Sequence, residues 1–102
     1  TYYYLIKNIP FSLKIGILSD SFDAEGVTKS NIECGFLPAD VEILKDKSGE
    51  DEGRAMAQVI YASAKDIKIA FYGANSQADF AMGIMKLKEA GCDVIVDDLG
   101  KL

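Results

Sequence analysis

The sequence predicts an α/β domain in three layers, with a mostly parallel sheet covered by helices on both faces. Short runs of strand type alternate with longer amphipathic segments, in the order β-α-β-α-β-α-β. Some of the strand runs are almost continuously apolar, which is typical of strands buried on both faces of a parallel sheet. A length of 102 residues, 49% of them hydrophobic, suits one compact domain. Crossovers between the parallel strands are expected to be right-handed.

Four strands are predicted, and most of them end at a polar residue or a glycine. They cover residues 14–19, 41–45, 67–72 and 93–96. Asp20 follows the first strand, Gly73 the third, and Asp97 and Asp98 the fourth. Residues 1–12 are expected to form a tail or an extra strand, and residues 13–102 a partial domain.

Three helices are predicted between these strands. They cover residues 24–34, a segment that begins between 48 and 51, and residues 77–90. Ser76 and Asp79 form a capping-box pattern at the start of the last helix, and Gly91 suits its C-terminal end. The apolar residues expected to face the sheet are Ala55, Met56, Val59, Ile60 and Ala62 in the second helix, and Phe80, Ala81, Ile84, Met85 and Leu87 in the third.

Charge and composition exclude several classes of function. The net charge is −5, which gives no electrostatic help to binding nucleic acid or an anionic membrane. No apolar run approaches the roughly 18 residues of a membrane span. The chain has no histidine, so it cannot build a histidine triad or a histidine-ligated zinc site alone. Cys34 and Cys92 form no metal-binding spacing and are expected to be buried free thiols. We expect no metal centre and no cofactor.

Acidic residues are predicted to meet at the carboxyl edge of the sheet, where open parallel sheets bind their ligands. Asp20, Asp97 and Asp98 end strands, and Asp51 and Glu52 open the helix that begins at the same edge. Carboxylates held close together cannot all ionise cheaply, so one of them tends to keep a proton. Such a group suits acid–base chemistry or the binding of a cation. Capping and solubility explain the same residues without any function.

Four segments resemble subtilases, the family of the subtilisin, kexin and sedolisin serine peptidases. Residues 15–22 are similar to the strand that bears the catalytic aspartate, and residues 51–60 to the helix that normally opens with His-Gly-Thr. Residues 67–71 and 90–100 are similar to the next two core strands, and the segments occur in family order. The Asp-Glu-Gly-Arg-Ala-Met run at 51–56 resembles a divergent bacterial branch of the family.

The resemblance implies that the chain is the N-terminal part of a subtilisin-like domain. Glu52 stands at the family's histidine position and would be the general base, with Asp20 orienting it. Asp98 lies at the strand end that faces the substrate in the family, where it would make the rim polar but have no catalytic role. The family nucleophile is a serine far downstream, so this chain alone is expected to be inactive. The parent protein would cleave a peptide or protein substrate, and would be secreted or lie in the cell envelope.

Three other interpretations remain open from the residues. A type I periplasmic-binding lobe would use Ser19, Asp20 and Ser21 on a small polar ligand. A receiver domain would hold Mg²⁺ between Asp20 and Asp98. A subtilase scaffold that has lost catalysis would keep only the fold. We also expect that the fourth strand forms an exposed sheet edge, through which two copies could dimerise.

Overall fold

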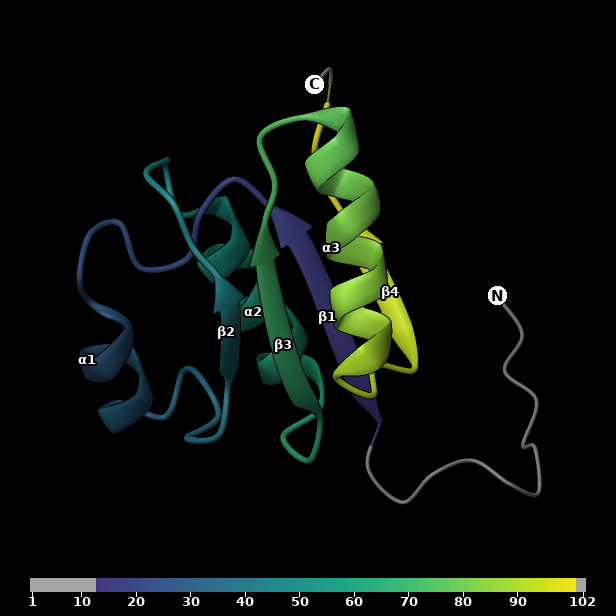
Figure 1. Ribbon diagram of the computed structural model, residues 1–102. Helices are drawn as coiled ribbons and strands as arrows, with labels where there is room; N and C mark the ends of the chain where they lie inside the picture. Colours follow the sequence, from purple (N-terminus) through teal and green to yellow (C-terminus); the bar gives the residue numbers. More distant parts are fainter. Residues whose placement is uncertain (1–12, 101–102) are drawn as a thin grey trace, which may run out of the picture.

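The computed structural model describes residues 13–100, so the tail or strand expected over residues 1–12 lies outside it. It confirms the α/β class, with a four-stranded parallel sheet and helices on both faces (Figure 1). The elements are β1 (Lys14–Ser19), α1 (Thr28–Glu33), β2 (Glu42–Lys45), α2 (Glu52–Ser63), β3 (Lys68–Gly73), α3 (Gln77–Glu89) and β4 (Val94–Asp97). The predicted elements are all present, with ends that differ by a few residues.

The sheet has the strand order β2-β3-β1-β4, and every neighbouring pair is parallel. The two central strands, β1 and β3, are largely buried, which explains their apolar runs. The two edge strands are more exposed, and Val94 of β4 keeps 44% of its surface in solvent. The expected edge position of β4 is therefore confirmed within the four strands that the structure describes.

Side chains alternate between two cores, one on each face of the sheet. Ile17 and Phe71 point toward α1 and α2, and this core is completed by Phe22 and Leu37. Neighbouring positions in the same strands point to the other face, where Leu87 of α3 covers them. Alternation of this kind follows from the two-residue period of a strand.

The inner faces of the helices agree only in part with the prediction. Leu87 is buried, and Met56, Ile60 and Phe80 pack against the cores, but small residues make the closest approach to the sheet. In α2, Gly53 and Ala57 are buried while Val59 is 68% exposed. In α3, Gly83 lies so close to the sheet that a Cβ atom there would meet side-chain atoms of β1 and β3 at 2.6 Å. Val59 and Met85, which were predicted to face the sheet, are instead largely exposed.

One crossover is left-handed, contrary to the expectation of right-handed connections throughout. The steps from β2 to β3 and from β3 to β4 run the same way across the sheet, yet α2 and α3 cover opposite faces. The two connections must therefore differ in hand. In Figure 1 the strands point upward, α3 lies in front and α2 behind, which makes the α3 connection right-handed and the α2 connection left-handed. Parallel crossovers are right-handed in about 98% of cases.

Hydrogen bonds to the segment after β1 hold this unusual connection. The Asp46 carboxylate, just after β2, accepts the backbone N–H groups of Phe22 and Asp23, both at 2.9 Å. Residues 50–53 bind the same segment from the start of α2. The path of the chain is thus fixed by contacts with the β1–α1 loop, against the right-handed preference that strand twist gives.

The sequence patterns predicted both ends of α3 correctly. The Ser76 hydroxyl accepts the backbone N–H of Asp79 at 3.1 Å, which confirms the predicted cap of α3. Gly91 follows this helix with φ = 90°, as a C-terminal glycine does. The cysteine prediction was wrong in one respect, because Cys34 is a free thiol but is exposed, and Cys92 is partly buried.

Candidate carboxylate site at the edge of the sheet

Three of the predicted acids come together at the carboxyl edge of the sheet. Asp20 directly follows β1, Glu52 is the first residue of α2, and Asp98 follows β4. β1 and β4 are neighbours, and the backbone N–H of Asp98 donates to the carbonyl of Leu18 at 3.3 Å. The site is therefore built by adjacent strands and by the helix that starts beside them.

The carboxylate of Asp20 is surrounded by backbone N–H groups. It accepts from Ser21 and Glu50, both at 2.6 Å, and from Glu52 at 3.0 Å. Burial by itself would raise the pKa of Asp20, but the N–H donors of Glu50, Ser21 and Glu52 outweigh it and lower the pKa. The Asp20 carboxylate therefore favours its ionised form and anchors the start of α2.

The side chain of Glu52 is exposed and lies near the Asp98 carboxyl group, while the backbone N–H of Glu52 donates to the Asp20 carboxylate. The hydrogen bond with Asp98 raises the pKa of Glu52, and the negative charges of Asp98, Asp20 and Glu50 raise it further. The charges of both Asp20 and Asp98 act on Glu52, and Asp98 has the larger effect on its pKa.

Asp51 was expected at the rim but is buried, with 3% of its surface exposed. Its carboxylate accepts from the Ser21 hydroxyl at 2.6 Å, from the backbone N–H groups of Ala24 and Glu25 at 2.8 Å, and from Arg54 Nη1 at 2.7 Å. Burial opposes the charge, but the hydrogen bond from Ser21 and the other donors lower the pKa of Asp51 to about 2. Asp51 therefore stays ionised and does not share a proton.

Ser21 and Arg54 complete this buried cluster, although Ser21 was considered only as a possible ligand contact in a binding lobe. Ser21 Oγ accepts the backbone N–H of Asp51 at 2.7 Å, and Arg54 Nη1 also donates to the carbonyl of Phe22 at 2.9 Å. Asp51 itself has φ = 58°, the left-handed region that non-glycine residues rarely adopt. The one local signal was the three-residue spacing of Asp51 and Arg54, which brings two side chains together on a helix.

An apolar groove adjoins the Glu52–Asp98 pair on the α2 face. It has a volume of about 580 Å³ and is lined by Glu52, Asp98 and the apolar residues Ala55, Met56, Val59, Ile60 and Val96. The outward apolar face of α2 thus forms one wall and β4 contributes the other. An apolar hollow with polar groups at one end is typical of small-molecule and peptide side-chain sites.

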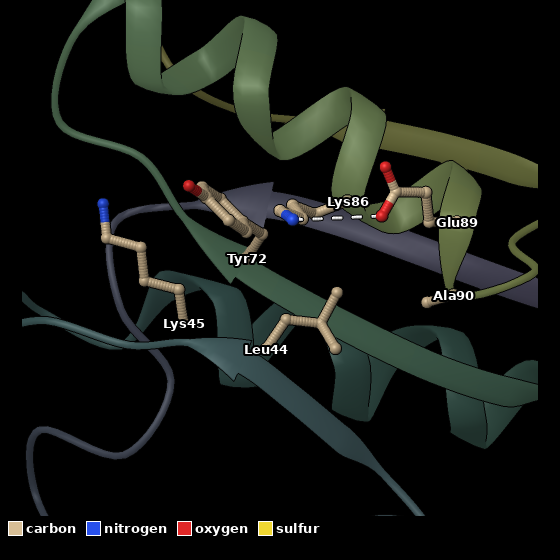
Figure 2. A pocket seen from close by; sticks show the side chains of 6 residues that line it. All are labelled: Leu44, Lys45, Tyr72, Lys86, Glu89 and Ala90. Carbon is tan, nitrogen blue, oxygen red and sulfur yellow. Dashed lines mark ion pairs between the residues drawn. The ribbon is translucent and has the colours of Figure 1, made fainter.

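A second hollow lies on the α3 face and contains none of the predicted site residues. Figure 2 shows its lining, with Leu44 and Tyr72 below α3, and the Lys86–Glu89 ion pair at 3.9 Å above them. Its other lysine, Lys45, is paired with Asp79 of α3 at 2.5 Å. Both lysines are thus already neutralised, so this hollow has little electrostatic attraction for an anionic ligand.

The contact between Glu52 and Asp98 gives a direct prediction. Asp98→Asn is expected to lower the pKa of Glu52 toward its ordinary value, because the largest two causes of the raised pKa both come from Asp98. The measurement is the ¹³C NMR titration of the Glu52 side-chain carboxyl. Asp97→Asn is the matched control, because Asp97 is a neighbouring exposed acid. Equal titration of Glu52 in both variants would contradict the contact.

No family model matches this chain, and no curated protein or solved structure is significantly similar to it. Within residues 13–100, no helix is long and apolar enough to cross a membrane. These residues also contain no group of three or more histidine, cysteine or acidic side chains that could hold a metal ion. What the fold and site define is a class: a parallel α/β domain with an ionised aspartate and a glutamate–aspartate pair at its carboxyl edge.

Proposed function

We propose that this chain is the N-terminal part of a subtilisin-like serine peptidase domain in which Glu52 is the general base. The observation that carries the proposal is the location of Glu52, on the first turn of α2 and beside both Asp20 and Asp98. The sequence resemblance requires residues 20 and 52 to share one edge of the sheet, and they do. A serine outside this chain would be the nucleophile, and the substrate would be a peptide or protein.

In this reaction the serine hydroxyl attacks the peptide carbonyl while Glu52 takes the hydroxyl proton, and the proton later goes to the leaving amine. Glu52 is suited to this role because its side chain is exposed at the mouth of the apolar groove. Asp98, close to Glu52, raises the pKa of the proposed base. Asp20, kept ionised by N–H groups, supplies a fixed negative charge that favours the protonated form of Glu52.

The test is a longer protein that carries this chain together with a downstream serine. Glu52→Gln is expected to reduce kcat/KM by about 100-fold or more, because general acid–base catalysis contributes roughly 10²–10⁴-fold. Glu50→Gln is the matched control, since Glu50 is an exposed acid two residues away, and it should keep nearly full activity. Full activity of Glu52→Gln would end the proposal, and absence of serine-reagent-sensitive cleavage in the unmodified protein would favour a scaffold without catalysis.

The pH profile gives an independent check on the same base. Glu52 must be ionised to accept a proton, so kcat/KM should rise with pH through the pKa of Glu52 and then level off. Because neighbouring acids raise that pKa, Asp98→Asn should move the rising limb to lower pH. The 102-residue chain alone should cleave no peptide.

Two of the open interpretations fit the geometry less well. Ser19 and Ser21 are fully buried and Asp20 is occupied by N–H donors, so these side chains are not free to hold a small polar ligand. The common doubly wound orders keep β1 beside β2, as in the flavodoxin-like order of receivers, whereas here β3 separates them. Dimerisation through the β4 edge stays a prediction, which sedimentation at high protein concentration tests.

A further inference from the structure

Two segments far apart in the sequence are interlocked by two carboxylates, one from each segment. Asp20, in the segment 20–25, accepts N–H groups of Glu50 and Glu52. Asp51, in the segment 49–54, accepts the N–H groups of Ala24 and Glu25 in return. The exchange is reciprocal, so neither segment can shift without breaking hydrogen bonds to a charged acceptor, which are among the stronger ones.

The spacing between the segments is too small for them to move independently. The backbone N–H of Gly53 donates to the carbonyl of Ser21 at 3.1 Å, and a Cβ atom at Gly49 would lie 2.7 Å from Ser21 Oγ. At the centre, the hydroxyl of Ser21 bonds to both the carboxylate and the N–H of Asp51. These contacts hold Asp51 at φ = 58°, an unfavourable conformation of the kind that persists where the surroundings over-determine it.

We propose that Asp51, held by Ser21 and Arg54, is a positioning residue that aims the first turn of α2 at Asp20 and presents the Glu52 side chain to Asp98. The inference rests on the proposed function of Glu52, and it adds residues that touch neither substrate nor reacting atoms. Asp51 acts on the site through the backbone of residues 50–53. Its left-handed conformation turns the chain so that the N–H groups of Glu50 and Glu52 converge on one carboxylate.

The experiment measures the titration of the Asp20 and Glu52 carboxyl carbons by NMR in the unmodified chain, in Ser21→Ala and in Asp51→Asn. If Asp51 positions the turn, Ser21→Ala should raise the pKa of Asp20, because its N–H donors are no longer aimed at it. The pKa of Glu52 should fall toward its ordinary value as Glu52 separates from Asp98. Amide shifts of β3 and α3 should stay unchanged, which shows that the fold is intact.

In Asp51→Asn, the sign of the change in the pKa of Asp20 separates positioning from simple charge removal. Loss of the Asp51 charge alone would lower the pKa of Asp20, whereas loss of the aimed N–H groups raises it. Ser21→Ala is the deciding variant because it removes no charge, and Asp51→Asn takes its place if Ser21→Ala does not fold. Ser76→Ala, which removes the cap of α3, is the control and should leave both titrations unchanged.

Titrations of Asp20 and Glu52 that stay unchanged in folded Ser21→Ala would overturn the positioning role. If Ser21→Ala does not fold, a lowered pKa of Asp20 in Asp51→Asn would overturn the positioning role instead. Because the readout is the titration of carboxyl groups in this chain, it needs no peptidase activity. The positioning role can therefore fail while Glu52→Gln still abolishes cleavage, and the proposed function can fail while the titrations move as expected.

Discussion

Asp51→Ala is expected to destabilise the fold by about 3–5 kcal/mol, the usual cost of removing one partner of a buried ion pair. The change leaves the Arg54 guanidinium buried with its main carboxylate partner gone, and frees the Ser21 hydroxyl and two backbone N–H groups of the β1–α1 loop. It also leaves alanine at φ = 58°, a left-handed conformation that aspartate tolerates better because its side chain can hydrogen-bond locally.

Urea unfolding at neutral pH measures this loss. Asp66→Ala is the matched control, because Asp66 is an exposed aspartate and its replacement should change the free energy of unfolding by less than about 0.5 kcal/mol. If Asp51→Ala costs no more than Asp66→Ala, the buried cluster does not hold the two segments together.

Acid should remove part of the same stabilisation from the unmodified chain. The pKa of Asp51 falls from an ordinary value of 3.8 to about 2 in the folded state. A depressed carboxyl pKa stabilises the fold above the unfolded pKa, and this contribution is lost as pH falls from about 4 toward 2. It amounts to roughly 2 kcal/mol. The difference in stability between the unmodified chain and Asp51→Ala should therefore narrow over this pH range.

The burial of Asp51 also shows where sequence reasoning stops. The strands, the cap at Ser76 and the edge position of Asp20, Glu52 and Asp98 follow from local patterns and from one topological rule, so they could be predicted. The burial of Asp51 depends on Ser21, which lies 30 residues earlier and becomes a neighbour only in the folded chain. A run of three acids at 50–52 therefore looks like one charged rim, although its middle member is buried and paired.

The hand of the α2 connection and the inner faces of the helices were not predictable for a related reason. Statistical rules favour a right-handed crossover, and a tertiary network around residues 20–25 and 46–53 overrides that preference here. Apolar periodicity predicted Leu87 correctly on the inner face, but it also pointed Val59 and Met85 inward, and both are exposed. A hydrophobic pattern reports which side of a helix is apolar, and that side can remain in solvent.

Gly53→Ala is expected to destabilise the fold by about 2–3 kcal/mol, although alanine is ordinarily about 1 kcal/mol better than glycine inside a helix. A Cβ atom at residue 53 would overlap a ring carbon of Phe71 and would lie 2.7 Å from the backbone carbonyl oxygen of Ser21. Phe71 is fully buried and packs on Phe22 with ring centroids 5.2 Å apart, so its ring has little room to turn away. The helix must then move outward.

That movement would break the hydrogen bonds from Gly53 to Ser21 and from Glu52 to Asp20, so it would disturb the site together with the core. Gly83→Ala is the matched comparison, because the three atoms nearest to its Cβ belong to the side chains of Leu18 and Tyr72 and none of them is a backbone atom. We expect it to cost about 1 kcal/mol. Thermal unfolding of both variants, with NMR titration of Asp20, distinguishes them. A Gly53→Ala variant as stable as the unmodified chain would mean that α2 does not pack this closely on β1 and β3.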